Sequence, residues 1–94
     1  MSKPSFKTAI FYWLATKYLV KINDASSLEE SKLYFRQAID AAAAHCESGY
    51  TDAMRKVWHN VNSMNTYDEV LSYATNMVNK HRDKLERYDI LINN

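Results

Sequence analysis

The sequence predicts an all-α protein, a compact antiparallel bundle of about four helices in which the last helix is the longest. The chain of 94 residues contains one glycine and one proline, which leaves almost nothing from which to build tight β-turns. Apolar residues instead recur at alternating three- and four-residue steps, the spacing of one helix face, and helix-capping motifs separate these stretches. At this length we expect a single domain covering residues 1–94.

The first helix is expected to run from about Ser5 to Ile22. Pro4 fits a first helical turn, where its missing N–H is not needed, and no acidic residue precedes Asp24. Most of the helix circumference is apolar or aromatic, so we expect this helix at the centre of the bundle, buried on most sides. Four lysines form its polar strip and, at about 100° per residue, project within about 80° of each other. They are Lys3, Lys7, Lys17 and Lys21.

The second helix is expected to begin at one of two overlapping capping boxes, Ser26 with Glu29 or Ser27 with Glu30. In this motif the hydroxyl and the carboxylate satisfy backbone donors reciprocally. Gly49 stands where the residue after a helix, with positive φ, belongs. The apolar stripe between these limits consists of Leu28, Phe35, Ile39, Ala42 and Cys46.

A short third helix is expected to open at Thr51 and Asp52, and Thr66 with Glu69 forms another capping box before the last helix. The stripe of the third helix consists of Met54, Val57, Trp58, Val61 and Met64. The stripe of the last helix, at 4-3-4-3 spacing, consists of Tyr67, Leu71, Ala74, Val78, His81, Leu85, Tyr88 and Ile92, widened by Val70, Met77 and Leu91.

The apolar end of the last helix needs a cover. Residues 67–92 would extend about 39 Å as a helix, about twice the length that the third helix can cover. Ile90, Leu91 and Ile92 would then form a contiguous exposed apolar patch, which usually marks an interface. Unless the helix breaks near Tyr88 and Asp89, two arrangements are open: a homodimer or partner contact through the C-terminal end of this helix, or a return of that end onto the first helix.

The composition excludes several classes of protein. A content of 47% hydrophobic and 13% aromatic residues excludes intrinsic disorder. A net charge of +1 argues against a histone-like binder of polyanions. The apolar run at residues 9–15 is far shorter than the ~20 residues that span a bilayer, so we expect no membrane partner.

No constellation of residues predicts an enzyme, a metal site or a cofactor. The single cysteine, Cys46, excludes an internal disulfide and any cysteine-based zinc site, and favours a reducing compartment, the cytoplasm. His45, His59 and His81 have no partner at metal-ligand spacing. A chain with one glycine has neither a phosphate-binding loop nor a nucleophile elbow. The acidic pairs fall in first turns of helices, where capping explains them.

Two kinds of residue are candidates for binding a partner. The chain has seven tyrosines, more than a thin core can bury, and tyrosine is enriched in the hot spots of protein interfaces. Together with the lysine strip they give the predicted partner-binding set, which is Lys3, Lys7, Lys17, Lys21, Tyr18, Tyr34, Tyr50, Tyr73 and Tyr88. The alternatives are plain solvation of the lysines and packing of the tyrosines at the edge of the core.

We therefore expect a small non-enzymatic protein-binding module, an adaptor or inhibitor that docks on a partner protein or nucleoprotein complex. Small proteins of this kind are common among the accessory and anti-defence products of phages and mobile elements. The alternative function is nucleic-acid binding, through the basic face of the first helix or through the third helix.

The third helix and the one before it, with Gly49 between them, resemble a helix-turn-helix. The candidate contact residues on the third helix are Arg55, Lys56, His59 and Asn60. Two features depart from that motif: His45 stands where a small residue is wanted, and Asp52 would face the phosphates.

Overall fold

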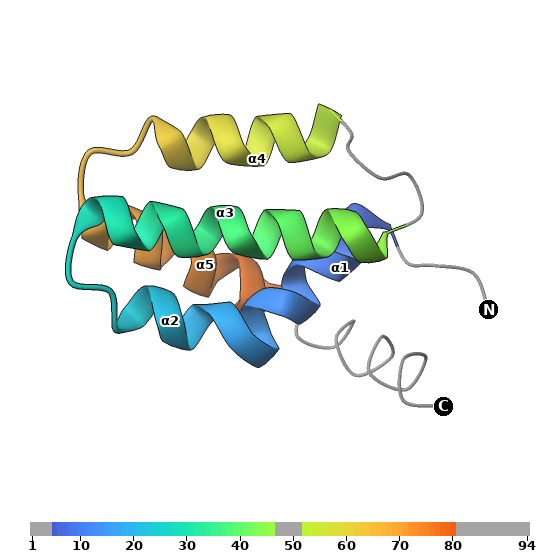
Figure 1. Ribbon diagram of the computed structural model, residues 1–94, viewed down its shortest axis with the longest axis horizontal. Coiled ribbons are helices and arrows are strands. Elements are labelled where there is room, and N and C mark those ends of the chain that lie inside the picture. The colour runs from blue at the N-terminus through green and yellow to red at the C-terminus, as the bar shows by residue number, and fades with distance from the viewer. Residues whose placement is uncertain (1–4, 47–51, 81–94) are drawn as a thin grey trace.

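The computed structural model describes residues 5–46 and 52–80, which form an antiparallel bundle of four helical rods (Figure 1). The first rod consists of three consecutive segments, α1 (Phe6–Trp13), the π-helical turn η1 (Leu14–Tyr18) and α2 (Leu19–Asn23). The others are α3 (Leu28–His45), α4 (Asp52–Asn62) and α5 (Tyr67–Lys80). Successive rods run in opposite directions (Figure 1), and the described residues contain no strand. The predicted all-α bundle is confirmed.

The described residues test only part of the prediction about the last helix. Within them α5 has 14 residues and α3, with 18, is the longest continuous α-helix. The continuation of the last helix to residue 92, and the dimer contact expected at Ile90, Leu91 and Ile92, lie outside the described residues.

Local capping bonds fix where two helices begin, as the sequence predicts. The Ser27 hydroxyl accepts from the backbone N–H of Glu30 at 3.1 Å. The Glu30 carboxylate accepts in turn from the backbone N–H and the hydroxyl of Ser26, at 3.3 and 3.0 Å. At the start of α5, the Thr66 hydroxyl accepts from the backbone N–H of Glu69 at 3.2 Å. The hydroxyls of Ser27 and Thr66 thus supply partners for the N–H groups of Glu30 and Glu69, which have none inside their helices.

The π-helical turn η1 was not predicted. The backbone N–H of Leu19 donates to the carbonyl of Leu14, five residues earlier, and the Thr16 hydroxyl donates to the Tyr12 carbonyl at 2.7 Å. A single π-turn inserts one residue into an α-helix. It therefore rotates all later residues by about 100° relative to the position that a uniform helix would give them. The expectation of a uniform first helix was wrong at this point.

This inserted residue explains the spacing of the core residues on the first rod. Ile10, Leu14, Tyr18 and Ile22 recur at every fourth position, and each is at most 7% exposed. In a uniform α-helix, three successive four-residue steps would turn the row by about 120° around the axis. The π-turn removes about 100° of that drift, so all four side chains reach the core.

The core lies between the first rod and α3, and the buried apolar residues form one cluster. α3 packs against α1, η1, α2, α4 and α5, and the first rod packs against α3, α4 and α5. The first rod is therefore central, as expected, and it shares that position with α3. Its outer face is exposed at Val20, which is 64% exposed.

The predicted stripe is mostly buried on α3, buried only in part on α4, and shifted on α5. Most of the α3 stripe, including Phe35 and Ile39, is buried, as are Met54 and Val61 of α4. On α5 the buried row is Val70, Ala74 and Val78. Tyr67 and Leu71, placed at the centre of that stripe by the sequence, are only half-buried. The Tyr67 hydroxyl instead donates to the Asn23 carbonyl at the end of α2.

The π-turn leads to a testable prediction about deletions. Removing Thr16, an exposed residue of η1, should convert residues 6–23 into a uniform α-helix whose two halves still face the core. We expect a folded protein whose free energy of unfolding changes by no more than about 1 kcal/mol, the worth of one hydrogen bond, because the uniform helix gives the Tyr12 carbonyl a backbone N–H in place of the Thr16 hydroxyl. Circular dichroism should therefore show a Tm within about 4–8 °C of that of the parent. Removing Gln37 from the regular helix α3 is the control. It should rotate Ile39 and Ala42 out of the core and prevent folding. Equal losses for the two deletions would contradict an inserted residue at η1.

A second prediction concerns the cap of α3. Ser27→Ala should lower the free energy of unfolding by about 1 kcal/mol, because the N–H of Glu30 loses its acceptor. Ser72→Ala, at an exposed position inside α5, should change stability by less than about 0.7 kcal/mol and in the stabilising direction, because alanine is the better helix former. Chemical denaturation of the two variants measures both effects, and a Ser27→Ala protein as stable as the parent would contradict the capping role.

Candidate functional site

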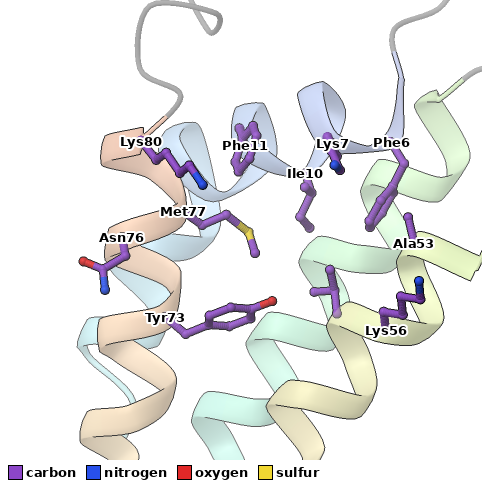
Figure 2. A pocket seen from close by; sticks show the side chains of 11 residues that line it. Phe6, Lys7, Ile10, Phe11, Ala53, Lys56, Tyr73, Asn76, Met77 and Lys80 are labelled. Atoms are coloured by element: carbon purple, nitrogen blue, oxygen red, sulfur yellow. The ribbon is translucent and has the colours of Figure 1, made fainter.

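A groove lies between α4 and α5. Both helices pack on α1 and α3, but within the described part of the chain they make few contacts with each other. The space between them has a volume of about 590 Å³, within the range of roughly 300–1,000 Å³ that is typical of ligand pockets. Figure 2 shows that side chains from three helices, α1, α4 and α5, surround it.

The base of the groove is apolar. Met77 of α5 points into the space (Figure 2). The ring of Tyr73 stacks on Phe35 of α3, with ring centroids 5.7 Å apart and planes inclined by 16°. This contact fixes the Tyr73 ring against the core, and its hydroxyl points into the groove (Figure 2). The other apolar lining residues are Phe6, Ile10 and Phe11 of α1 and Ala53 and Val57 of α4.

Three lysines, one from each helix, stand around this base: Lys7 of α1, Lys56 of α4 and Lys80 of α5. We call them the lysine rim. All three are exposed, and no described carboxylate lines the groove or forms an ion pair with them. The nearest ion pair on α4 joins Arg55 to Asp52, with nitrogen and oxygen 3.5 Å apart. The groove thus combines apolar surface with three cations that have no anionic partner among the described residues.

The predicted partner-binding residues divide between two places. Lys7 and Tyr73 lie at the groove. Four others form a second group, the lysine–tyrosine cluster, on η1, α2 and α3: Lys17, Tyr18, Lys21 and Tyr34. Lys3, Tyr50 and Tyr88 lie outside the described residues.

In the lysine–tyrosine cluster the cations contact rings of their own chain. The Lys17 ammonium lies 5.4 Å from the Tyr18 ring centroid, and the Lys21 ammonium lies 5.8 Å from Tyr18 and 5.6 Å from Tyr34. Cation–π contacts at exposed sites contribute about 0.5–1 kcal/mol each. Tyr18 itself is only 7% exposed, so its ring packs at the core, as the alternative interpretation of the tyrosines has it.

The π-turn explains why one predicted lysine strip became two separate sites. Lys7 precedes η1, Lys17 lies within it and Lys21 follows it. The inserted residue turns the two later lysines about 100° further from Lys7 than a uniform helix would. Lys7 therefore lies with α4 and α5, while Lys21 lies over Tyr34 of α3. The prediction of one continuous lysine strip was therefore wrong.

The candidate nucleic-acid residues of α4 are all exposed: Arg55, Lys56, His59 and Asn60. The charge of Arg55 is partly balanced by Asp52, and Lys56 belongs to the lysine rim. α3 and α4 lie side by side and run in opposite directions (Figure 1). Helices of a helix-turn-helix cross instead at about 90–120°, so the arrangement of α3 and α4 does not reproduce that motif.

Sequence reasoning did not single out Lys80 or recognise Met77 as a groove residue. Both belong to one face of α5, since Tyr73, Met77 and Lys80 follow each other at four- and three-residue steps. That face is readable from the sequence. Its position opposite Lys7 and Lys56 is not, because it depends on how three helices pack.

The part of the chain that the structure describes offers few other candidate sites. No group of three or more His, Cys, Asp or Glu residues there could hold a metal ion. None of the described helices has the length and apolar character needed to cross a bilayer. Cys46 is buried, and the His45 ring packs beside the indole of Trp13 at 5.3 Å between centroids.

Comparisons of the chain with protein-family models, with curated proteins and with solved structures gave no match. The geometry of the groove is therefore the basis on which a function can be proposed.

Proposed function

We propose that the protein is a small non-enzymatic binding module, an adaptor or inhibitor, that docks on a partner protein through the groove between α4 and α5. The single observation that carries this proposal is the groove itself, in which apolar side chains of three helices border a space of about 590 Å³ inside the lysine rim. Covering apolar surface is favourable at roughly 25 cal/mol per Å², so a complementary partner gains free energy by filling the space.

The residues at the groove suit protein recognition. The Tyr73 ring is held by its stacking on Phe35 and directs its own hydroxyl into the groove. Tyrosine is enriched in binding hot spots. Met77 is unbranched and polarisable, so it adapts to the shape of a partner side chain. Grooves between helices are also a common place for a partner segment to dock.

Nucleic-acid binding is the alternative function, and the unpaired charges of Lys7, Lys56 and Lys80 favour it. A phosphate backbone would engage these ammonium groups but would leave the apolar base of the groove uncovered. The two functions therefore differ in whether the apolar residues matter.

The proposal predicts that blocking the groove abolishes capture of the partner. Val57→Arg places a long charged side chain in the groove, whereas Val20→Arg makes the same change at a site that is 64% exposed on α2. Each variant would be immobilised and exposed to nuclease-treated lysate of the source organism, and the retained proteins identified by mass spectrometry. We expect a partner that the parent and Val20→Arg retain and that Val57→Arg loses by at least about tenfold, as for an interface hot spot. Circular dichroism of both variants confirms that they are folded.

Two outcomes would contradict the proposal. One is that no protein is retained in a Val57-dependent manner. The other is that, in untreated lysate, nucleic acid is retained equally by the parent and by Val57→Arg, which would favour the alternative function.

A further inference from the structure

We infer that the segment which fills the groove is an acidic amphipathic helix of the partner, with about two turns in contact, apolar side chains on the base and carboxylates at the lysine rim. This inference rests on the proposed function and names the chemistry of the partner. It follows from the charge of the rim, from the dimensions of the walls and from the apolar character of the base.

The charge of the rim selects the sign of the occupant. Lys7, Lys56 and Lys80 come from three different helices and converge on one space, so a bound segment meets all of them. No carboxylate among the described lining residues offsets their charge. A segment with lysine or arginine flanks would place like charges opposite one another, which is unfavourable, whereas carboxylate flanks complement the rim and speed association.

The walls set the length of the occupant. On α5 the lining residues run from Tyr73 to Lys80, a rise of about 10.5 Å, or two helical turns. On α4 they run from Ala53 to Val57, a little over one turn. A helix that presents apolar residues at positions i, i+3 or i+4 and i+7 covers a base of this length.

The lysines are unevenly spaced along the groove, which predicts the charge pattern of the partner. Lys7 and Lys80 lie at the end where α1 crosses, and Lys56 lies on the α4 wall, across the groove from Tyr73 on α5 (Figure 2). The carboxylates of the partner should therefore gather toward one end of the segment and along one flank. The flank that lies along Tyr73 should be apolar, or should carry a group that hydrogen-bonds the phenol.

The apolar base argues for a folded amphipathic segment in preference to an extended acidic one. Phe6, Ile10, Phe11 and Met77 offer no backbone hydrogen-bonding edge, so an extended chain would bury its own N–H and C=O groups against apolar side chains. Unpaired buried backbone groups are costly. A helix satisfies those groups internally and presents only its side chains.

The test uses the full chain and two fluorescein-labelled twelve-residue peptides, each constrained to be helical. Both carry leucine or phenylalanine at i, i+3, i+4 and i+7. One has glutamate flanks and the other has lysine in the same places. Fluorescence polarisation at 50 and 200 mM salt measures their affinities. We expect the acidic peptide to bind at least tenfold more tightly than the basic one at 50 mM salt, with a smaller ratio at 200 mM because salt screens the rim.

A pair of matched double variants locates the contact. Lys56→Glu with Lys80→Glu reverses two rim charges, and Lys17→Glu with Lys21→Glu makes the same charge change in the lysine–tyrosine cluster. All four lysines are exposed, so we expect both proteins to fold. The rim variant should lose at least about tenfold in affinity for the acidic peptide and gain affinity for the basic one, while the cluster variant should change by less than about threefold.

Several results would overturn the inference. Equal affinity for the two peptides would remove charge selection, and equal losses in the two double variants would place the contact elsewhere. Saturable binding of dodecanoate that Val57→Arg abolishes, together with no binding of either peptide, would assign the groove to small amphiphiles, and tighter binding of a DNA duplex than of the acidic peptide would favour nucleic acid. If the acidic peptide does not bind but a protein partner is still captured from lysate in a Val57-dependent manner, the inference is wrong and the proposed function is retained. Loss of both results would reject both.

Discussion

The arrangement of the whole bundle depends on one inserted residue in the first rod. The π-turn η1 keeps Ile10 and Ile22 on the same side of a rod that is five helical turns long. Without it, either the α1 half or the α2 half would turn its core residues toward solvent, because a four-residue step overshoots one α-helical turn by about 40°. With it, the first rod packs on α3 along its full length, and that pair forms the platform on which α4 and α5 rest.

The groove is a consequence of that platform. Because α4 and α5 gain their burial against α1 and α3, they need not close on each other. Phe6, Ile10 and Phe11 of α1 are then shared between the core and the groove: they are almost fully buried and yet line the open space. Docking would draw its free energy mainly from the half-buried lining residues Val57, Tyr73 and Met77, since exposed ion pairs contribute only about 0–1 kcal/mol each. The lysine rim would instead decide which partner is accepted and how fast it associates.

Local chemistry explains why some features were predictable. The caps at Ser27 and Thr66 each involve residues three positions apart, so their hydrogen bonds need no tertiary contact. The π-turn was also readable in principle, since a row of apolar residues at strict four-residue spacing does not fit one face of a uniform helix. The prediction of one lysine strip was wrong because it left out the rotation of about 100° at η1. That rotation separates Lys7 from Lys17 and Lys21.

The sequence by itself determined that the chain is helical, where α3 and α5 begin, and which face of α3 is apolar, because these depend on backbone propensity and on contacts within one or two turns. The tertiary structure alone decided that Lys7, Lys56 and Lys80 meet around one space and that Tyr73 lies on Phe35. The sequence pattern of a helix gives the direction in which each side chain projects from the axis of that helix. What lies opposite that side chain is set by the separation of the helices, which results from packing the whole core at once.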